Sequence, residues 1–400
     1  MYALLPYQGV VYSRRNRAQF GRLAVSDLDT AENLWGGADA SLSFRNVLVG
    51  SPEQRSQIWQ AWISAGELEM EDHRGFHVLR PEFQGEDGTA RTRWALLGSA
   101  HVDGGKILTH ENVIAEGVER ARQATESCEA DIAPIFCGCD DEAGAELRRM
   151  LPSMVSDAPP LIEFTDGTQA KISFWSIHAP RAVQSLADLF RNRDLFLLDG
   201  HHRLAGAKEN QRHGLGDGQI LACVTSMREE DIAILPIHRV VHCQRWILQD
   251  TLQAELVALG CRLRELPGYG PHEVRRALRD LGSARLYCLM VHAHSNRLWQ
   301  VEFGGGLEAA LPLASLPVHH LDEAVLKNVE GSVAIPVPDD RLALEQLALD
   351  QAQVGFFLPP ARADQVRDVA RCGLVMPRKS TRFVPKPPLG LVCRPWSLSG

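Results

Sequence analysis

The chain has 400 residues, of which 45% are apolar and 23% are charged, and its formal net charge is −8. This composition is typical of a globular protein long enough for two domains, or for one large domain with an addition. The negative net charge argues against broad nucleic-acid binding, although a chain with this net charge can still carry local basic patches.

Neither the N-terminus nor the cysteines indicate secretion. The first arginines follow the first apolar residues, which is the reverse of the order in a signal peptide. No apolar run approaches the roughly 20 residues that a membrane span needs. Cys137 and Cys139 form a C-x-C pair, but no second pair lies at zinc spacing, which argues against a structural zinc site. We therefore expect a reduced, cytoplasmic protein.

Taken in order, residues 1–50 predict short strands and loops, and residues 51–66 predict a capped helix. Ser51 can cap this helix and Pro52 suits its first position. Trp59 and Trp62 fall at helical spacing and are expected in the core. Strands are then predicted over 75–79, 93–98, 132–137 and 171–177, and helices over 115–127 and 180–190.

Residues 195–208 predict a strand, a tight turn and a helix. The apolar run 195–198 is typical of a strand buried on both faces, although periodicity alone does not exclude a helical segment. Gly200 permits a turn with positive φ, and the residues from Leu204 onward favour a helix. His201, His202 and Arg203 would then lie on the first helical turn, where backbone N–H groups are unpaired. Cations there are unfavourable unless an anion shares the site, and phosphate is the obvious candidate.

The alternative is an ordinary helix start, in which Asp199 acts only as a cap. Several ionisable side chains directly after a buried strand favour a functional site instead. Ligation of one metal ion by His201 and His202 together is disfavoured, because adjacent helical residues point about 100° apart.

Glu111 is a second candidate, since it follows His110 just before the predicted helix over 115–127. A His–Glu pair can orient a proton-transfer group, or bind a cation through the carboxylate. Glu111 can equally lie in a solvated helix start, where it complements the helix dipole. Spacing alone does not decide between the two.

Two strands are predicted after the central helix, over 219–226 and 232–241, and Pro236 indicates an edge or a bend in the second. His238 and Arg239 are polar residues inside this apolar run, which indicates a pocket lining or a buried ion pair. We favour the pocket. Further along, the sequence predicts helices over 245–259, 271–281 and 342–349, and strands over 284–293, 298–303 and 354–358.

The stretch 376–386 is basic. It carries four cations and two hydroxyls, namely Arg378, Lys379, Arg382 and Lys386 with Ser380 and Thr381. A solvated tail is the plain interpretation. The Met, Phe and Val interleaved with the charges favour a packed segment that lines an anion site.

Five motifs, in one sequence order, resemble a known family. They are THE at 109–111, DGHHR at 199–203, ILPIHRVV at 234–241, VGFFLPP at 354–360 and MPRKSTRFVPK at 376–386. Together they resemble the large bacterial family catalogued as a domain of unknown function, number ten-fifteen, from about Gln54 to Leu391. Its usual patterns are DGHHRY, LPxHRVV and MPxKSTxFxPK. This chain departs from them at Leu204, where the family has an aromatic residue, and the family's N-terminal P-P-Y-D-V-I segment is not recognisable.

The family is distantly similar to the fold shared by ParB partition proteins, sulfiredoxin and the free-serine kinases. In that fold a Gly-x-x-Arg turn holds nucleotide phosphates, and Gly200 and Arg203 match its spacing. The resemblance implies an α/β protein with a mixed α+β sheet, in which residues 1–245 contain a ParB-like nucleotide-binding core. Residues 246–400 would form a C-terminal α/β portion, whose basic end packs back on the core.

The resemblance also implies a function, a nucleotide-dependent kinase that phosphorylates the hydroxyl of a small molecule such as free L-serine. Phosphoryl transfer requires cations that position phosphates, a magnesium-binding carboxylate and a base. The catalytic candidates are Asp199, Glu111 and His202, with Asp199 and Glu111 also as Mg²⁺ ligands. The predicted contacts to ATP, ADP or CTP are Gly200, His201, His202, Arg203, His238, Arg239, Lys379, Ser380, Thr381 and Lys386.

The alternative function is a ParB-like nucleotide-binding switch without transfer to a small molecule, and nucleotide hydrolysis is a further enzymatic option. A sulfiredoxin-like redox role is disfavoured, because His201 rather than a cysteine precedes His202. The expected partner is a small hydroxylated substrate, and a homodimer is compatible with either function. Membrane and nucleic-acid partners are not expected.

Overall fold

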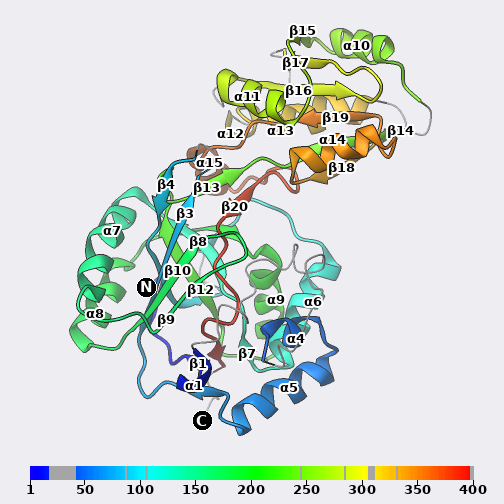
Figure 1. Cartoon of the computed structure of the whole chain (residues 1–400). Coiled ribbons are helices and arrows are strands. Elements are labelled where there is room, and N and C mark those ends of the chain that lie inside the picture. The colour runs from blue at the N-terminus through cyan, green and yellow to red at the C-terminus, as the bar shows by residue number, and fades with distance from the viewer. Residues whose placement is uncertain are drawn as a thin grey trace. The chain divides into compact units, whose positions relative to one another are not determined.

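The computed structural model describes residues 1–17, 42–85, 88–103, 107–243, 246–282, 285–304, 311–329 and 332–396. The chain folds into two compact units, the first made of Met1–Ala233 and Pro385–Gly400 and the second of Ile234–Val384 (Figure 1). The sequence predicts a boundary near residue 245, whereas the units divide before β14 (His238–Cys243). The reason is that β14 pairs with β18 (Ser332–Val337) and β19 (Val354–Phe357) of the second unit.

The first unit is built on a nine-stranded mixed sheet. Its strand order is β6-β11-β8-β12-β5-β3-β10-β9, with β4 paired to β3. The pairs β6–β11 and β8–β12 are parallel, and the other pairs are antiparallel. The strands are β3 (Phe76–Gln84), β4 (Ala90–Thr92), β5 (Ala95–His101), β6 (Ile107–Leu108), β8 (Ile135–Cys139), β9 (Ile162–Thr165), β10 (Lys171–Ile177), β11 (Leu195–Asp199) and β12 (Gln219–Ser226). The predicted mixed α/β class is confirmed.

Helices flank this sheet, with α7 and α8 to one side and α6 and α9 to the other (Figure 1). The helices of the unit are α1 (Arg14–Arg17), α4 (Phe44–Val49), α5 (Pro52–Ser64), α6 (Ala115–Glu126), α7 (Asp141–Val155), α8 (Pro180–Leu189) and α9 (His201–Arg212). As predicted, the Ser51 side chain caps α5, and Trp59 and Trp62 are buried. Two short strand pairs complete the unit, β1 (Val10–Tyr12) with β2 (Leu68–Met70), and β7 (Ala130–Asp131) with β21 (Arg394–Pro395).

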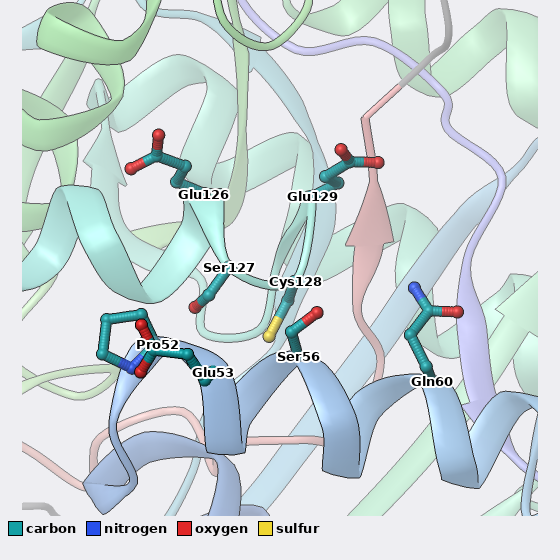
Figure 2. A pocket seen from close by; sticks show the side chains of 8 residues that line it. All are labelled: Pro52, Glu53, Ser56, Gln60, Glu126, Ser127, Cys128 and Glu129. Atoms are coloured by element: carbon teal, nitrogen blue, oxygen red, sulfur yellow. The ribbon is translucent and has the colours of Figure 1, made fainter.

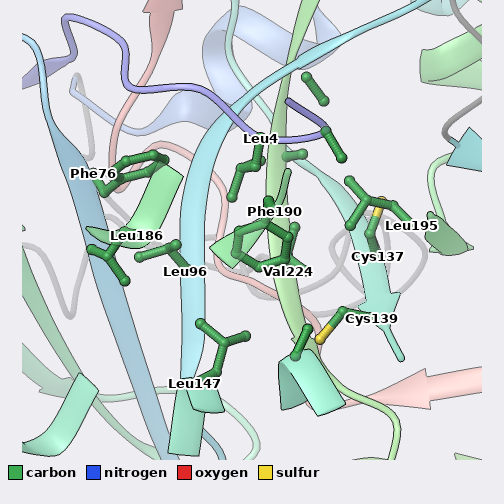
Figure 3. Close-up of a cluster of buried hydrophobic side chains, with 14 of the residues drawn as sticks. Leu4, Phe76, Leu96, Cys137, Cys139, Leu147, Leu186, Phe190, Leu195 and Val224 are labelled. Carbon is green, nitrogen blue, oxygen red and sulfur yellow. The ribbon is translucent and has the colours of Figure 1, made fainter. Parts of the chain in front are cut away.

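The core of the first unit joins the sheet to α7, α8 and α9. Leu147 of α7 and Leu186 of α8 pack in this core (Figure 3), and Leu204 of α9 belongs to the same cluster of buried residues. The buried strand residues include Ile135, Cys137, Cys139, Leu195, Leu197, Ala222 and Val224. Because β11 and β8 lie inside this core, the residues at their ends are held in fixed positions.

The second unit has its own sheet and core. Its six strands are all antiparallel, in the order β15-β17-β16-β19-β14-β18. The remaining elements are β13 (Ala233–Leu235), β15 (Arg262–Leu266), β16 (Tyr287–His292), β17 (Leu298–Glu302), β20 (Arg382–Val384), α10 (Gln249–Ala258), α11 (Pro271–Leu281), α12 (Leu311–Ala314), α13 (Pro317–His320), α14 (Asp340–Ala348) and α15 (Ala363–Arg371), with a π-helical turn at Leu321–Val325 and a 3-10 turn at Leu326–Asn328. Val274 of α11 and Leu344 of α14 pack in this core. Over the ranges described above, no helix is both long and apolar enough to span a membrane.

A buried network of polar side chains connects the N-terminal segment, through Tyr7, to His77 on β3 of the first sheet. The Tyr7 hydroxyl lies 2.8 Å from Nδ1 of His77, and His77 Nε2 lies 3.0 Å from a Glu71 carboxylate oxygen. The other Glu71 oxygen accepts a hydrogen bond from Ser176 at 2.8 Å and lies 3.3 Å from His178. Burial alone would raise the pKa of Glu71, but His77, Ser176 and His178 outweigh it and lower this pKa to about 2.

This network predicts a pH dependence of stability. The pKa of Glu71 is about 2 in the fold and 4.5 in the reference state. The ionised carboxylate therefore contributes about 3 kcal/mol at neutral pH, and this contribution disappears as the pH falls from about 4.5 towards 2. Urea unfolding of wild type and Glu71→Gln across this range should give free energies that differ at pH 7 and converge at acid pH. A constant difference would contradict the assignment.

Candidate functional site

The predicted strand, turn and helix are present around Gly200. Strand β11 ends at Asp199, Gly200 adopts φ +98° and ψ 25°, and α9 begins at His201. Helix α9 therefore begins directly after the left-handed glycine, and His201, His202 and Arg203 lie on its first turn, as predicted. A Cβ atom at position 200 would lie 2.9 Å from Arg203 Nη2 and 3.0 Å from Ile135 Cγ2. Only glycine allows Arg203 to fold back over the turn.

Gly200→Ala is expected to lower the free energy of unfolding by about 1–3 kcal/mol, since a non-glycine residue in this region is strained and its methyl group would clash with Arg203. Gly214→Ala is the matched control, because Gly214 also has positive φ (+74°) but nothing lies within 4 Å of its Cβ position. Urea denaturation of both variants separates the clash from the backbone strain. Equal losses of unfolding free energy in the two variants would mean that a methyl group at position 200 does not clash with Arg203.

Asp199 is held by two cations. Arg203 Nη2 donates to one carboxylate oxygen at 2.8 Å, and Lys386 Nζ lies 3.5 Å from the other. Burial would raise the pKa of Asp199, but Arg203 and then Lys386 overcome it and lower the pKa to about 2. The carboxylate is therefore ionised at neutral pH. Of the predicted residues, Asp199, Arg203 and Lys386 are in direct contact.

Two histidines lie beside this carboxylate as neutral rings. His201 and His110 meet edge to face, with their ring centroids 4.8 Å apart. Burial lowers the pKa of His201 to about 4, although Asp199 opposes the shift, and burial with His201 lowers the pKa of His110 to about 3. Nε2 of His201 is buried and has no hydrogen-bond partner. From the sequence, His110 was predicted only as the partner of Glu111 in a His–Glu pair, and its contact with His201 was not predicted.

His202 points to α6 instead. The backbone N–H of Ile114 donates to His202 Nε2 at 3.2 Å, and a Cβ on Gly117 would lie 2.4 Å from the His202 ring. His202 therefore joins the start of α6 to the start of α9. Glu111 is half-buried on the segment that connects β6 to α6.

The donor atoms at this site do not suit a resident magnesium ion. Mg²⁺ prefers one or two carboxylates together with phosphate oxygens. Both oxygens of Asp199 already face cations, so this carboxylate does not fit a resident Mg²⁺. Among the residues that the structure describes, no group of three or more His, Cys, Asp or Glu side chains is arranged to hold a metal ion.

The other predicted contacts belong to the second unit. Arg239 is buried and makes a two-pronged ion pair with Asp322, at 3.2 and 3.1 Å. Its remaining N–H groups donate to backbone carbonyls, those of Ile237, His238, Arg378 and Lys379. The pocket lining that we favoured from the sequence is therefore wrong for Arg239, which forms a buried ion pair and binds the backbone of the 378–379 turn.

The neighbours of Arg239 are also tied into the second unit. His238 is buried, and its Nδ1 accepts the N–H of Leu358 at 3.2 Å. The Ser380 hydroxyl donates to the carbonyl of Pro377, while Lys379 adopts a positive φ of 54°. Thr381 is half-buried. The predicted residues are thus divided, with Asp199 to Arg203, Glu111 and Lys386 in the first unit and the rest in the second.

A pocket elsewhere on the first unit contains none of these residues. Figure 2 shows it where the first half of α5 faces the end of α6. Its lining is acidic and is formed by Pro52, Glu53, Ser56, Gln60, Glu126, Ser127, Cys128 and Glu129. Burial raises the pKa of the Cys128 thiol to about 11, so this thiol is not a thiolate at neutral pH.

Comparisons with known proteins identify a matching family and several solved structures of remotely similar fold. The profile of a family described as "Protein of unknown function (DUF1015)" matches residues 50–284. The motifs at 354–360 and 376–386 lie outside this match. No curated protein matches the chain.

Three of the solved structures that match illustrate the likeness. They are a free serine kinase in complex with AMP (15% identity, TM-score 0.38, 72% of this chain and 88% of that chain), a conserved hypothetical protein from Pyrococcus furiosus (13%, 0.36, 72% and 90%) and a C-terminally truncated SbnI from Staphylococcus aureus (14%, 0.39, 72% and 82%).

Proposed function

This chain belongs to the DUF1015 family, whose function is unknown, and from its site we propose that it is a nucleotide-dependent kinase that phosphorylates the hydroxyl of a small molecule such as free serine. The observation that carries the proposal is the turn after β11. A buried strand leads through a left-handed glycine into a helix N-terminus, where an ionised carboxylate lies between Arg203 and Lys386. Unpaired N–H groups at a helix start favour a phosphate.

The charges suit phosphoryl transfer, which depends mainly on positioning and on electrostatic stabilisation. Arg203 and Lys386 now pair with Asp199, and both can turn to phosphate oxygens when a nucleotide binds. Such a turn would leave Asp199 ionised and less tightly paired. His201 and His110, neutral at pH 7, add no charge that would hold the phosphates too tightly for release.

In the proposed step, the hydroxyl oxygen of the acceptor attacks the terminal phosphorus of the nucleotide. Asp199 takes the hydroxyl proton, and the bond from phosphorus to the bridging oxygen breaks. The nucleotide leaves with one phosphate fewer.

The test is transfer of labelled phosphate from ATP, ADP and CTP to free serine, threonine and homoserine, with phosphorus NMR of the products. A phosphorylated hydroxy-amino acid is the expected result. If no acceptor is phosphorylated but the oligomeric state changes with nucleotide, the kinase is wrong and the nucleotide-binding switch takes its place.

Arg203→Ala is expected to weaken nucleotide binding by about 10- to 100-fold, since a lost charge-assisted hydrogen bond costs about 1.5–3 kcal/mol. The melting temperature should change little, because the Arg203 side chain is a quarter exposed and contributes little to the core. Isothermal titration measures the affinity, and Arg212→Ala, an exposed arginine at the other end of α9, is the control. Wild-type affinity in Arg203→Ala would end the phosphate role.

A further inference from the structure

Arg93 is a fully buried arginine outside the motifs that the sequence singles out. It lies between β4 and β5 in the first unit, where its backbone N–H donates to the carbonyl of Pro81 at 3.0 Å. Its relative exposure is 0%. A guanidinium cannot shed its charge at physiological pH, so this burial places a full positive charge inside the protein.

The partners of Arg93 do not balance that charge. Nη2 donates to the carbonyl of Pro385 at 2.6 Å, and the guanidinium lies over the Phe136 ring, 4.8 Å from its centroid. Nε and Nη1 are buried and have no hydrogen-bond partner. No carboxylate among the described residues forms an ion pair with Arg93. A buried charge left in this state is costly, since buried charges are normally paired.

Two other arginines show the usual arrangement. Arg239 and Arg394 are 3% and 2% exposed, and each donates to carboxylate oxygens as well as to carbonyls. Arg93 is buried at least as deeply, but its guanidinium contacts only the Phe136 ring and the carbonyl of Pro385. The difference points to an anion that the chain itself does not supply.

The position of Arg93 connects it to the Asp199 site. Phe136, on which the guanidinium lies, is the register partner of Asp199 across β8 and β11. The carbonyl that Arg93 holds belongs to the residue directly before Lys386, whose ammonium is 3.5 Å from Asp199. The C-terminal segment, red in Figure 1, thus touches Arg93 with one residue and Asp199 with the next.

We propose that Arg93 is an anion ligand of this site, and that its two unpartnered N–H groups bind a phosphate group of the nucleotide. The inference rests on the proposed function for the identity of the ligand. Arg93 would add a third cation to Arg203 and Lys386, and it lies in the connection between β4 and β5 rather than at the helix start. A site with cations at separate positions fits a polyphosphate better than a single phosphate, because successive phosphate groups can meet different cations.

The test measures binding of inorganic tripolyphosphate and of orthophosphate by isothermal titration and thermal shift, on the full chain without nucleotide. Arg93→Met removes the charge and keeps an apolar stem of similar length, while Arg93→Lys keeps the charge and loses the planar fork. Arg80→Met is the matched control. Arg80 also lies over aromatic rings, 5.6 Å from Trp94 and 5.2 Å from Trp175, but it is paired with Glu82 at 2.8 Å.

We expect tripolyphosphate to bind wild type more tightly than orthophosphate, and Arg93→Met to lose about 10- to 100-fold in tripolyphosphate affinity. Its melting temperature without ligand should equal or exceed that of wild type, because an unpaired buried charge has been removed. Arg93→Lys should fold and bind at reduced affinity. Arg80→Met should bind as wild type does.

A structural role for Arg93 would give the opposite pattern, with a lower melting temperature of the unliganded Arg93→Met protein and unchanged tripolyphosphate affinity in Arg93→Lys. Either result on its own overturns the proposal. If Arg93 governs anion binding but no acceptor is ever phosphorylated, the kinase function fails and the anion site remains. If transfer occurs and the Arg93 variants bind tripolyphosphate normally, the kinase remains and this inference fails.

Discussion

Asp199→Asn is expected to lower the turnover of phosphoryl transfer by about 10²–10⁴-fold, the usual contribution of general base catalysis. The substitution keeps the shape of the side chain and removes its charge, so the amide cannot take the proton of an acceptor hydroxyl. Nucleotide should bind at least as tightly as to wild type, because a negative charge beside the phosphates is gone. A loss in kcat with unchanged or lower Kd is therefore the expected signature.

The measurement is labelled-phosphate transfer and nucleotide titration on wild type and Asp199→Asn side by side. Asp188→Asn is the control, because Asp188 is an exposed carboxylate paired with Arg191 at 2.5 Å on the same unit. Turnover in Asp199→Asn equal to that of wild type would remove Asp199 from the chemistry. If the variant loses nucleotide binding as well, Asp199 serves to position Arg203 and Lys386 rather than to accept a proton.

The local part of this site could be predicted from the sequence. An apolar run that ends in an acidic residue and a glycine, followed by helix-favouring residues, indicates a strand, a turn and a helix from the chain's own preferences. Gly200 with φ +98° confirms that turn. The structure also has His201 to Arg203 on the first turn of α9, as predicted, because the turn at Gly200 sets where the helix begins.

The distant contacts could not be predicted from local sequence patterns, and only the family resemblance implied that the basic C-terminal end packs back on the core. Lys386 reaches Asp199 and Pro385 reaches Arg93 only because the C-terminal segment returns to the first unit after the whole second unit. Arg239 illustrates the same limit. Its position inside an apolar run indicated either a pocket lining or a buried ion pair. Its partner Asp322 lies in a stretch without any motif, so the sequence could not decide between these two interpretations.

Helix α7 is absent from the predicted elements, although its signals are present in retrospect. The Asp140 side chain caps it and accepts the N–H of Ala143 at 2.8 Å, and Leu147, Leu151 and Val155 repeat at helical spacing on its buried face. Gly144 and Pro152 inside the helix weaken these signals, since both residues lower helix propensity. Packing against the sheet outweighs that cost. Gly144 allows α7 to lie close to the sheet, because a Cβ at this position would lie 2.8 Å from the Ser226 side chain of β12.

The return of the C-terminal segment depends on a buried ion pair, and breaking it is expected to have the largest effect on stability. Arg394 Nε donates to Asp131 at 2.7 Å, Nη1 donates to Asp217 at 2.7 Å, and Nη2 donates to the carbonyl of Gln219. Both Arg394 and Asp131 are 2% exposed. Burial raises the pKa of Asp131 even with Arg394 in place, so this carboxylate depends on its partner to stay ionised.

Arg394→Met should therefore lower the free energy of unfolding by about 3–5 kcal/mol, because it leaves a buried carboxylate without its counter-charge. The double variant Arg394→Met, Asp131→Asn should recover part of this loss, since the amide no longer carries a charge. Urea denaturation of both variants and of wild type measures the coupling. Arg191→Met, which breaks the exposed pair with Asp188, should cost no more than about 1 kcal/mol. A loss of that small size in Arg394→Met would show that the segment bearing Lys386 is held to the first unit by its apolar residues, such as Leu391 and Val392, and not by this pair.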